Sequence, residues 1–78
     1  MSEAEKISRA SAEAVGTAMA ALKRSMPEAS EWRRVLMILG NAAASAGMLG
    51  IDREDVLALA GGAYENGSAH GPVQSLFD

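Results

Sequence analysis

Few side chains in this sequence could carry out chemistry. The chain has one histidine, His70, and no cysteine. His70 lies between Asn66 and Pro72, in a segment with turn and linker composition. A general base must be held within hydrogen-bond reach of the proton that it removes, and a flexible segment does not hold a side chain in this way. We therefore interpret His70 as a solvated loop residue, and expect no catalytic residue, no bound cofactor and no enzymatic activity.

A cluster of carboxylates is the next candidate, for metal binding. Asp52, Glu54 and Asp55 are close in sequence, and Glu65 follows. They lack the alternating spacing and the central glycine of a calcium-binding loop. Negative charge is favoured at the start of a helix, which explains the first three without a metal ion. Because cysteine ligands for zinc are also missing, the sequence predicts no metal site.

The strongest candidate for molecular recognition is the sequence Trp32-Arg33-Arg34. Tryptophan and arginine are enriched among the residues that dominate binding at protein interfaces. The alternative is that Trp32 covers one end of the core while Arg33 and Arg34 are solvated. We favour this second interpretation, but retain all three residues as candidate interaction residues.

Three helices are expected to position these residues, over about 3–25, 28–49 and 52–65. In the first, apolar residues recur at helical spacing; they are Ile7, Val15, Ala18, Leu22 and Met26. Pro27 separates this helix from the second, since proline is tolerated only in the first turn of a helix. The second helix could be capped by Ser25 with Glu28 or by Ser30, and the sequence leaves both open. Gly50 suits the end of the second helix, and Asp52 the N-cap of the third.

A long uncharged segment, Val35 to Ile51, begins within the second helix and extends just past its end. It is shorter than the roughly 20 apolar residues that span a bilayer, so we expect a central helix buried on most sides and no membrane association. Its second part, Asn41 to Gly47, consists almost entirely of small residues. One chain this short has little left to cover that part, and a dimer contact is expected there. Asn41 could fix register within such a contact or face solvent.

The C-terminal part is expected to be a linker followed by a short apolar tail. Residues 67–78 form this part, and residues 1–66 form the three-helix domain. We expect the tail to fold back on the helices and to bury Leu76 and Phe77, which makes both candidate interaction residues. The fold class predicted is therefore all-α, a small three-helix domain with a short C-terminal tail.

The segment Ala42 to Ala60 resembles a helix-turn-helix unit when its turn glycine is placed at Gly50. Ala46 then takes the small-residue position of the first helix. Four residues fall on buried positions; they are Leu49, Ile51, Val56 and Leu59. This resemblance implies a transcriptional regulator that binds DNA. However, the residues that would face DNA carry a net charge of −2, from Asp52 to Asp55, and they would repel the phosphate backbone.

Composition favours a different function. The formal charge of −3 gives no basic surface for nucleic acid, and the absence of cysteine suits the cytoplasm. With one residue each of Trp, Tyr and Phe, the core of this short chain is small, and a second copy would supply the missing surface. We predict a non-enzymatic protein–protein interaction module that is a homodimer. Accessory or inhibitor proteins of phages and mobile elements are of this kind.

Overall fold

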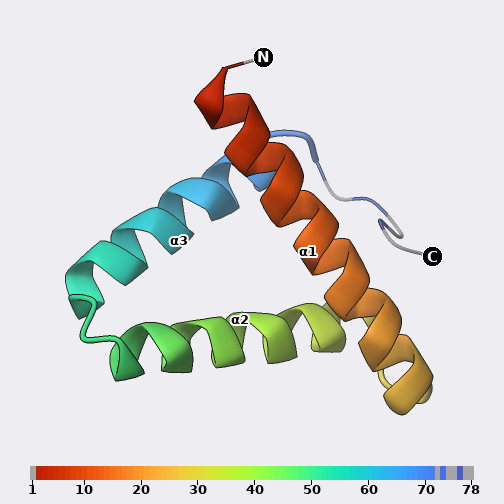
Figure 1. The fold of residues 1–78 in the computed structure, drawn as a ribbon. Coiled ribbons are helices and arrows are strands. Elements are labelled where there is room, and N and C mark those ends of the chain that lie inside the picture. The colour runs from red at the N-terminus through yellow and green to blue at the C-terminus, as the bar shows by residue number, and fades with distance from the viewer. Residues whose placement is uncertain (1, 72, 74–75, 77–78) are drawn as a thin grey trace. The chain divides into compact units, whose positions relative to one another are not determined.

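The structure is a computed structural model that describes residues 2–71, 73 and 76. Three helices follow one another along the chain, with bounds α1 Glu3–Ser25, α2 Glu31–Met48 and α3 Arg53–Ser68 (Figure 1). No strand occurs among the described residues. The predicted small all-α domain of three helices is therefore confirmed. The helices are distributed over two compact units: the first includes the described residues up to Ile38, and the second extends from Leu39 to Leu76.

Helix α1 has favourable chemistry at both ends. The Ser2 side chain accepts a hydrogen bond from the Glu5 backbone N–H at 3.2 Å, which caps the helix at its start. Glu3 and Glu5 lie in the first turn, and Lys23 and Arg24 in the last. These signs complement the helix dipole, and α1 begins and ends at the residues that the sequence predicts.

A short turn separates α1 from α2. The Ala29 backbone N–H donates to the Met26 carbonyl at 3.1 Å, so the chain turns immediately around Pro27. The Arg33 backbone N–H then donates to Ser30 Oγ at 3.3 Å. Ser30 is therefore the residue that caps α2, and the alternative with Ser25 and Glu28 is wrong. The helix begins at Glu31 rather than at residue 28, because the intervening residues are used in the turn.

The first unit has a small core. Its most buried side chains are Met19, Ala29 and Arg34, which are 2%, 9% and 5% exposed. Both helices also carry half-buried residues that lie close to these in sequence; they include Val15, Ala18, Leu22, Met37 and Ile38. On α2, Arg34, Met37 and Ile38 share one face, since they are three and four positions apart. This face of α2 and the C-terminal half of α1 thus provide the core of the unit.

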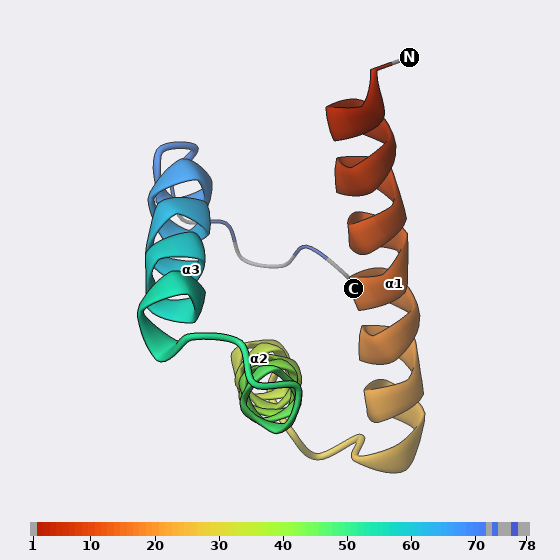
Figure 2. The same ribbon diagram turned by 60° about the vertical axis from the view of Figure 1, so that its left-hand side comes forward.

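In the second unit, α2 and α3 are joined by a tight turn (Figure 2). Gly50 has a φ of 77°, in the left-handed region that favours glycine. The backbone N–H of Gly50 donates to Gly47 O, and that of Ile51 donates to Ala46 O. This pair of bonds is the Schellman arrangement that ends many helices. Asp52 then caps α3 by accepting a hydrogen bond from the Glu54 backbone N–H at 3.1 Å.

Helix α3 extends further than the sequence predicts. It continues through Gly61 and Gly62 and ends at Ser68, three residues beyond the expected end at 65. The two glycines weaken a helix but do not interrupt its hydrogen bonds. The helix ends instead shortly before Gly71, where φ is 80° and the left-handed conformation stops it.

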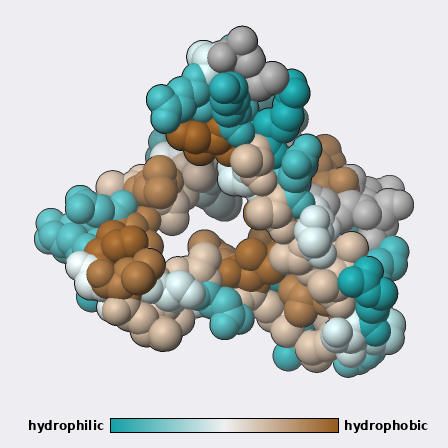
Figure 3. All heavy atoms as spheres, viewed as in Figure 1, coloured by the Kyte–Doolittle hydropathy of each residue, from teal (hydrophilic) through white to brown (hydrophobic). Residues whose placement is uncertain are grey.

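The expectation that Val35 to Ile51 is buried on most sides is wrong. Large side chains along this segment are exposed, including Leu36, Leu39, Met48, Leu49 and Ile51. Apolar atoms are visible on the surface where α2 and α3 meet (Figure 3). The reason is that the second unit has only two helices, and each can cover only one face of the other.

Candidate interaction surface

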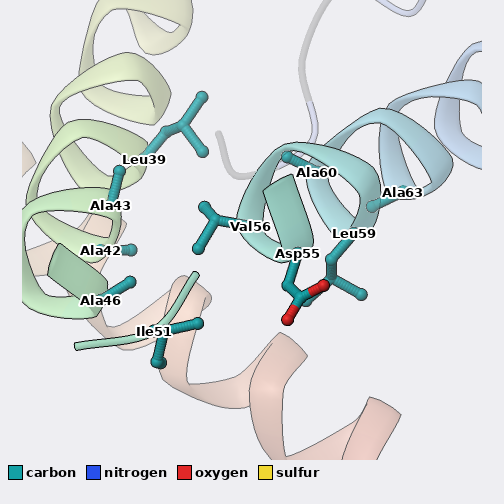
Figure 4. A pocket seen from close by; sticks show the side chains of 10 residues that line it. All are labelled: Leu39, Ala42, Ala43, Ala46, Ile51, Asp55, Val56, Leu59, Ala60 and Ala63. Carbon is teal, nitrogen blue, oxygen red and sulfur yellow. The ribbon is translucent and has the colours of Figure 1, made fainter. Parts of the chain in front are cut away.

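The second unit contains an apolar groove between its two helices, which we call the α2–α3 groove. Its volume is about 440 Å³. Figure 4 shows side chains of α2 on one side, side chains of α3 on the other, and Ile51 from the turn at one end. The groove is lined by Leu39, Ala42, Ala43, Ala46, Ile51, Asp55, Val56, Leu59, Ala60 and Ala63.

The groove follows from the spacing and size of these residues. On α2 the lining positions are three and four apart, and on α3 the same spacing recurs from Val56 to Ala63, so each set occupies one helix face. Val56 extends toward α2 (Figure 4). Five of the ten lining residues are alanines, whose side chains do not fill the space between the helices. As a result Ala46, Val56 and Ala60 are half-buried, and no described residue of this unit is fully buried.

The groove has one charged residue among those that line it, Asp55. Two more carboxylates, Asp52 and Glu54, belong to the same first turn of α3, and both are exposed. Of the charged residues from Leu39 to Leu76, four are acidic and one, Arg53, is basic. An apolar groove with an acidic end therefore suits an apolar occupant that carries a hydrogen-bond donor or a positive charge.

The candidate residues Trp32, Arg33 and Arg34 have three different environments. Trp32 is 68% exposed and Arg33 is exposed, but Arg34 is buried. Arg34 Nη2 donates to the Pro27 carbonyl at 3.4 Å, whereas Arg34 Nε has no hydrogen-bond partner. The interpretation that Trp32 covers the core and that both arginines are solvated is therefore wrong. Arg34 shares the inward face of α2 with Met37 and Ile38, whereas Trp32 lies on a different face of the helix.

Of the other candidate residues, the structure describes Asn41 and Leu76. Asn41 is exposed, and its backbone carbonyl accepts a hydrogen bond from Ser45 Oγ at 2.9 Å. Leu76 is 73% exposed, so its expected burial is wrong. Phe77 lies outside the described residues. His70 is exposed in the turn that follows α3.

The residues of the helix-turn-helix alignment are also placed differently from expectation. The turn at Gly50 is present, but Leu49 and Leu59 are 79% and 78% exposed. Ile51 is exposed as well, and Val56 is half-buried. The expectation that these four positions are buried is wrong, because the third helix that covers them in such units has no counterpart within Leu39 to Leu76.

The sequence indicated only one wall of the groove. The small residues from Asn41 to Gly47 were expected to lack cover within the chain, and three of the lining alanines belong to them. The α3 wall was missed. The sequence nevertheless carried a signal for this wall. Val56, Ala60 and Ala63 are four and three positions apart, and Asp55 directly precedes Val56, so all four residues lie on one face of the helix.

Metal binding and membrane insertion are two other roles that a helical chain could have. The part of the chain that the structure describes contains no group of histidine, aspartate and glutamate residues able to hold a metal ion. Likewise, no helix among residues 2–71 combines the length and the apolar character needed to cross a membrane.

Comparison of this chain with protein families, with curated proteins and with solved structures finds no match. Function must therefore be inferred from the residues themselves.

Proposed function

We propose that this protein is a non-enzymatic interaction module that forms a homodimer and acts through the surfaces of its helices on another protein. The observation that carries this proposal is the exposed apolar surface of the second unit. Met48, Leu49 and Leu59 are each more than three-quarters exposed, and the α2–α3 groove is apolar apart from Asp55. Contiguous apolar surface of this kind marks interaction sites in soluble proteins.

A second copy is the simplest source of cover for this surface. Burying apolar area stabilises a protein by roughly 25 cal/mol per Å², and a chain of this length gains little from its own core. Association of two copies would add the missing burial and would make stability depend on protein concentration.

Sedimentation analysis tests the homodimer. At micromolar concentration we expect a species of about twice the 8.1 kDa chain mass, and a melting temperature that rises with concentration. A folded monomer with a melting temperature independent of concentration would contradict the proposal.

DNA binding is a weaker second candidate, supported by the helix–turn–helix arrangement around Gly50. The charges oppose it, because the exposed start of α3 carries Asp52, Glu54 and Asp55. If it binds DNA, a mobility shift should appear at low salt and weaken as salt rises, and an Arg53→Ala variant should bind less. The absence of a shift at low salt would exclude this candidate.

A further inference from the structure

The α2–α3 groove lies wholly within the second unit and follows about two turns of each helix. On α2 its lining runs from Leu39 to Ala46, and on α3 from Asp55 to Ala63. Spans of seven and eight positions correspond to about 10 and 12 Å along a helix axis. Ile51 lies at the end where the turn joins the two helices (Figure 4). The groove is therefore elongated along both helices, with the turn at one end.

The occupant that suits this shape is a third helix. An amphipathic helix that lies in an apolar groove presents anchoring side chains at positions i, i+4 and i+7, which span about 10 Å as well. Half of the lining residues are alanines, so the groove has room for the larger side chains of such a helix. No described residue of the second unit is fully buried, and a helix packed on both α2 and α3 would give this unit the core that two helices lack.

The charges of the second unit indicate the polar part of the occupant. Asp55 lines the groove, and Asp52 and Glu54, in the same first turn of α3, are exposed. Arg53 is the one positively charged residue against four acidic residues from Leu39 to Leu76. A lysine or arginine near this end of the groove would be attracted, and a carboxylate there would be repelled. The occupant that the groove favours is therefore apolar on one face and basic at one end.

We propose that the α2–α3 groove binds a helix of a different protein, one with large apolar residues along one face and lysine or arginine where it meets Asp55. This inference rests on the proposed action on another protein and names the chemistry of that partner. A second copy is a poorer occupant, because its own second unit has the same excess of negative charge. Met48 and Leu49 lie outside the groove lining, and Leu59 is 78% exposed although it lines the groove. The homodimer therefore retains apolar surface from these three side chains.

Two synthetic peptides test the charge requirement. Both are alanine-based helices of about 18 residues with leucine at positions i, i+4 and i+7, and the next turn has a pair of lysines in the basic peptide and a pair of glutamates in the acidic peptide. Fluorescence anisotropy of a dye on the peptide measures binding to the full chain. We expect the basic peptide to bind at least about tenfold more tightly than the acidic one at low salt. The difference should decrease as salt rises, since salt screens exposed charges.

Charge changes at Asp55 locate the basic end of the bound peptide. Asp55→Asn should reduce the preference for the basic peptide to about threefold or less, and Asp55→Lys should favour the acidic peptide. Glu65→Lys is the matched control, because Glu65 is an exposed residue of α3 that does not line the groove. It makes the same change in net charge and should leave most of the preference intact, and circular dichroism checks that each variant keeps its helices. If Glu65→Lys and Asp55→Lys change the preference equally, the inference is overturned.

A pair of leucines on α2 tests the apolar contact. Leu39 and Leu36 are almost equally exposed, at 52% and 51%, but of the two only Leu39 lines the groove. Leu39→Ala should therefore weaken binding of the basic peptide by about fivefold or more, as loss of a contributing interface side chain does. Leu36→Ala should leave binding unchanged. An equal effect of the two variants would overturn the inference.

The outcomes distinguish this inference from the proposed homodimer. If both peptides bind equally, or neither binds, the inference is overturned even where sedimentation gives a dimer. If the basic peptide binds selectively to a chain that sediments only as a monomer, the inference stands and the homodimer is wrong. If Leu39→Ala lowers self-association while neither peptide binds the natural chain, a second copy occupies the groove and the inference is wrong.

Discussion

The two units of this chain use their apolar residues in opposite ways. In the first, Met19, Ala29 and Arg34 are buried, and several other side chains of α1 and α2 are half-buried. In the second, from Leu39 to Leu76, no described residue is buried, and large apolar side chains such as Met48 and Leu59 are exposed. The first unit thus forms a small core of its own, whereas the second presents a surface.

Helix α2 connects the two behaviours because it contributes to both units. In its first half the more buried face carries Arg34, Met37 and Ile38, while in its second half the face lining the groove carries Leu39 and Ala43. From Val35 to its end α2 carries no charged residue, so the half of the helix that lines the groove is uncharged throughout.

The largest effect should come from Met19, the one long apolar side chain that is buried among the residues that the structure describes. Met19→Ala removes most of a side chain that is 2% exposed, and such changes destabilise by about 2–5 kcal/mol. For a domain of this size, that lowers the melting temperature by roughly 10 °C or more. Thermal unfolding followed by circular dichroism at one fixed protein concentration measures the effect.

Leu59→Ala is the matched change in the second unit. Leu59 is 78% exposed, so its truncation should alter the stability of the isolated chain by no more than about 0.5 kcal/mol. Because it lines the groove, it should instead weaken self-association. If the two variants lowered the melting temperature equally and left association unchanged, the contrast between the units would be incorrect.

A smaller effect is expected at the turn of the second unit. Gly50→Ala places a side chain at a φ of 77°, although there is open space around the position. The cost is therefore one of backbone conformation, about 1–2 kcal/mol. Urea unfolding measures it, through a lower midpoint.

Gly61→Ala is the control for that experiment. Gly61 lies within α3 with ordinary helical φ, and a methyl group added there would meet nothing within 4 Å. Alanine there should stabilise the helix by roughly 0.5–1 kcal/mol. The same substitution thus has opposite signs at the two glycines. If Gly50→Ala were also stabilising, the turn that orients the groove would not depend on the left-handed conformation.

Local signals in the sequence predict most of the secondary structure. The cap at Asp52, the stop at Gly50 and the break at Pro27 identify three helices, because each acts on neighbouring backbone groups. The choice of Ser30 as a cap was not predictable, since the competing site at Ser25 has equally suitable chemistry. Burial was predicted least well. Arg34 is buried and Leu36 is exposed, since the side on which α1 packs depends on contacts between distant residues and not on local hydropathy.

The contrast between the two units also predicts a smaller effect on stability at Arg34, the charged residue in the core of the first unit. Arg34 Nη2 donates to the Pro27 carbonyl, whereas Nε has no hydrogen-bond partner, and burying an incompletely paired charge costs several kcal/mol. Arg34→Met keeps an unbranched apolar chain and removes the charge, so we expect stability between unchanged and about 1 kcal/mol higher. Chemical unfolding measures this, with the exposed Arg24→Met expected to stay within about 0.5 kcal/mol of the natural chain.

A loss of more than about 2 kcal/mol for Arg34→Met would show that its bond to Pro27, which ties the 26–30 turn to α2, outweighs the burial of charge. Stability of the first unit would then depend on that bond more than on apolar packing.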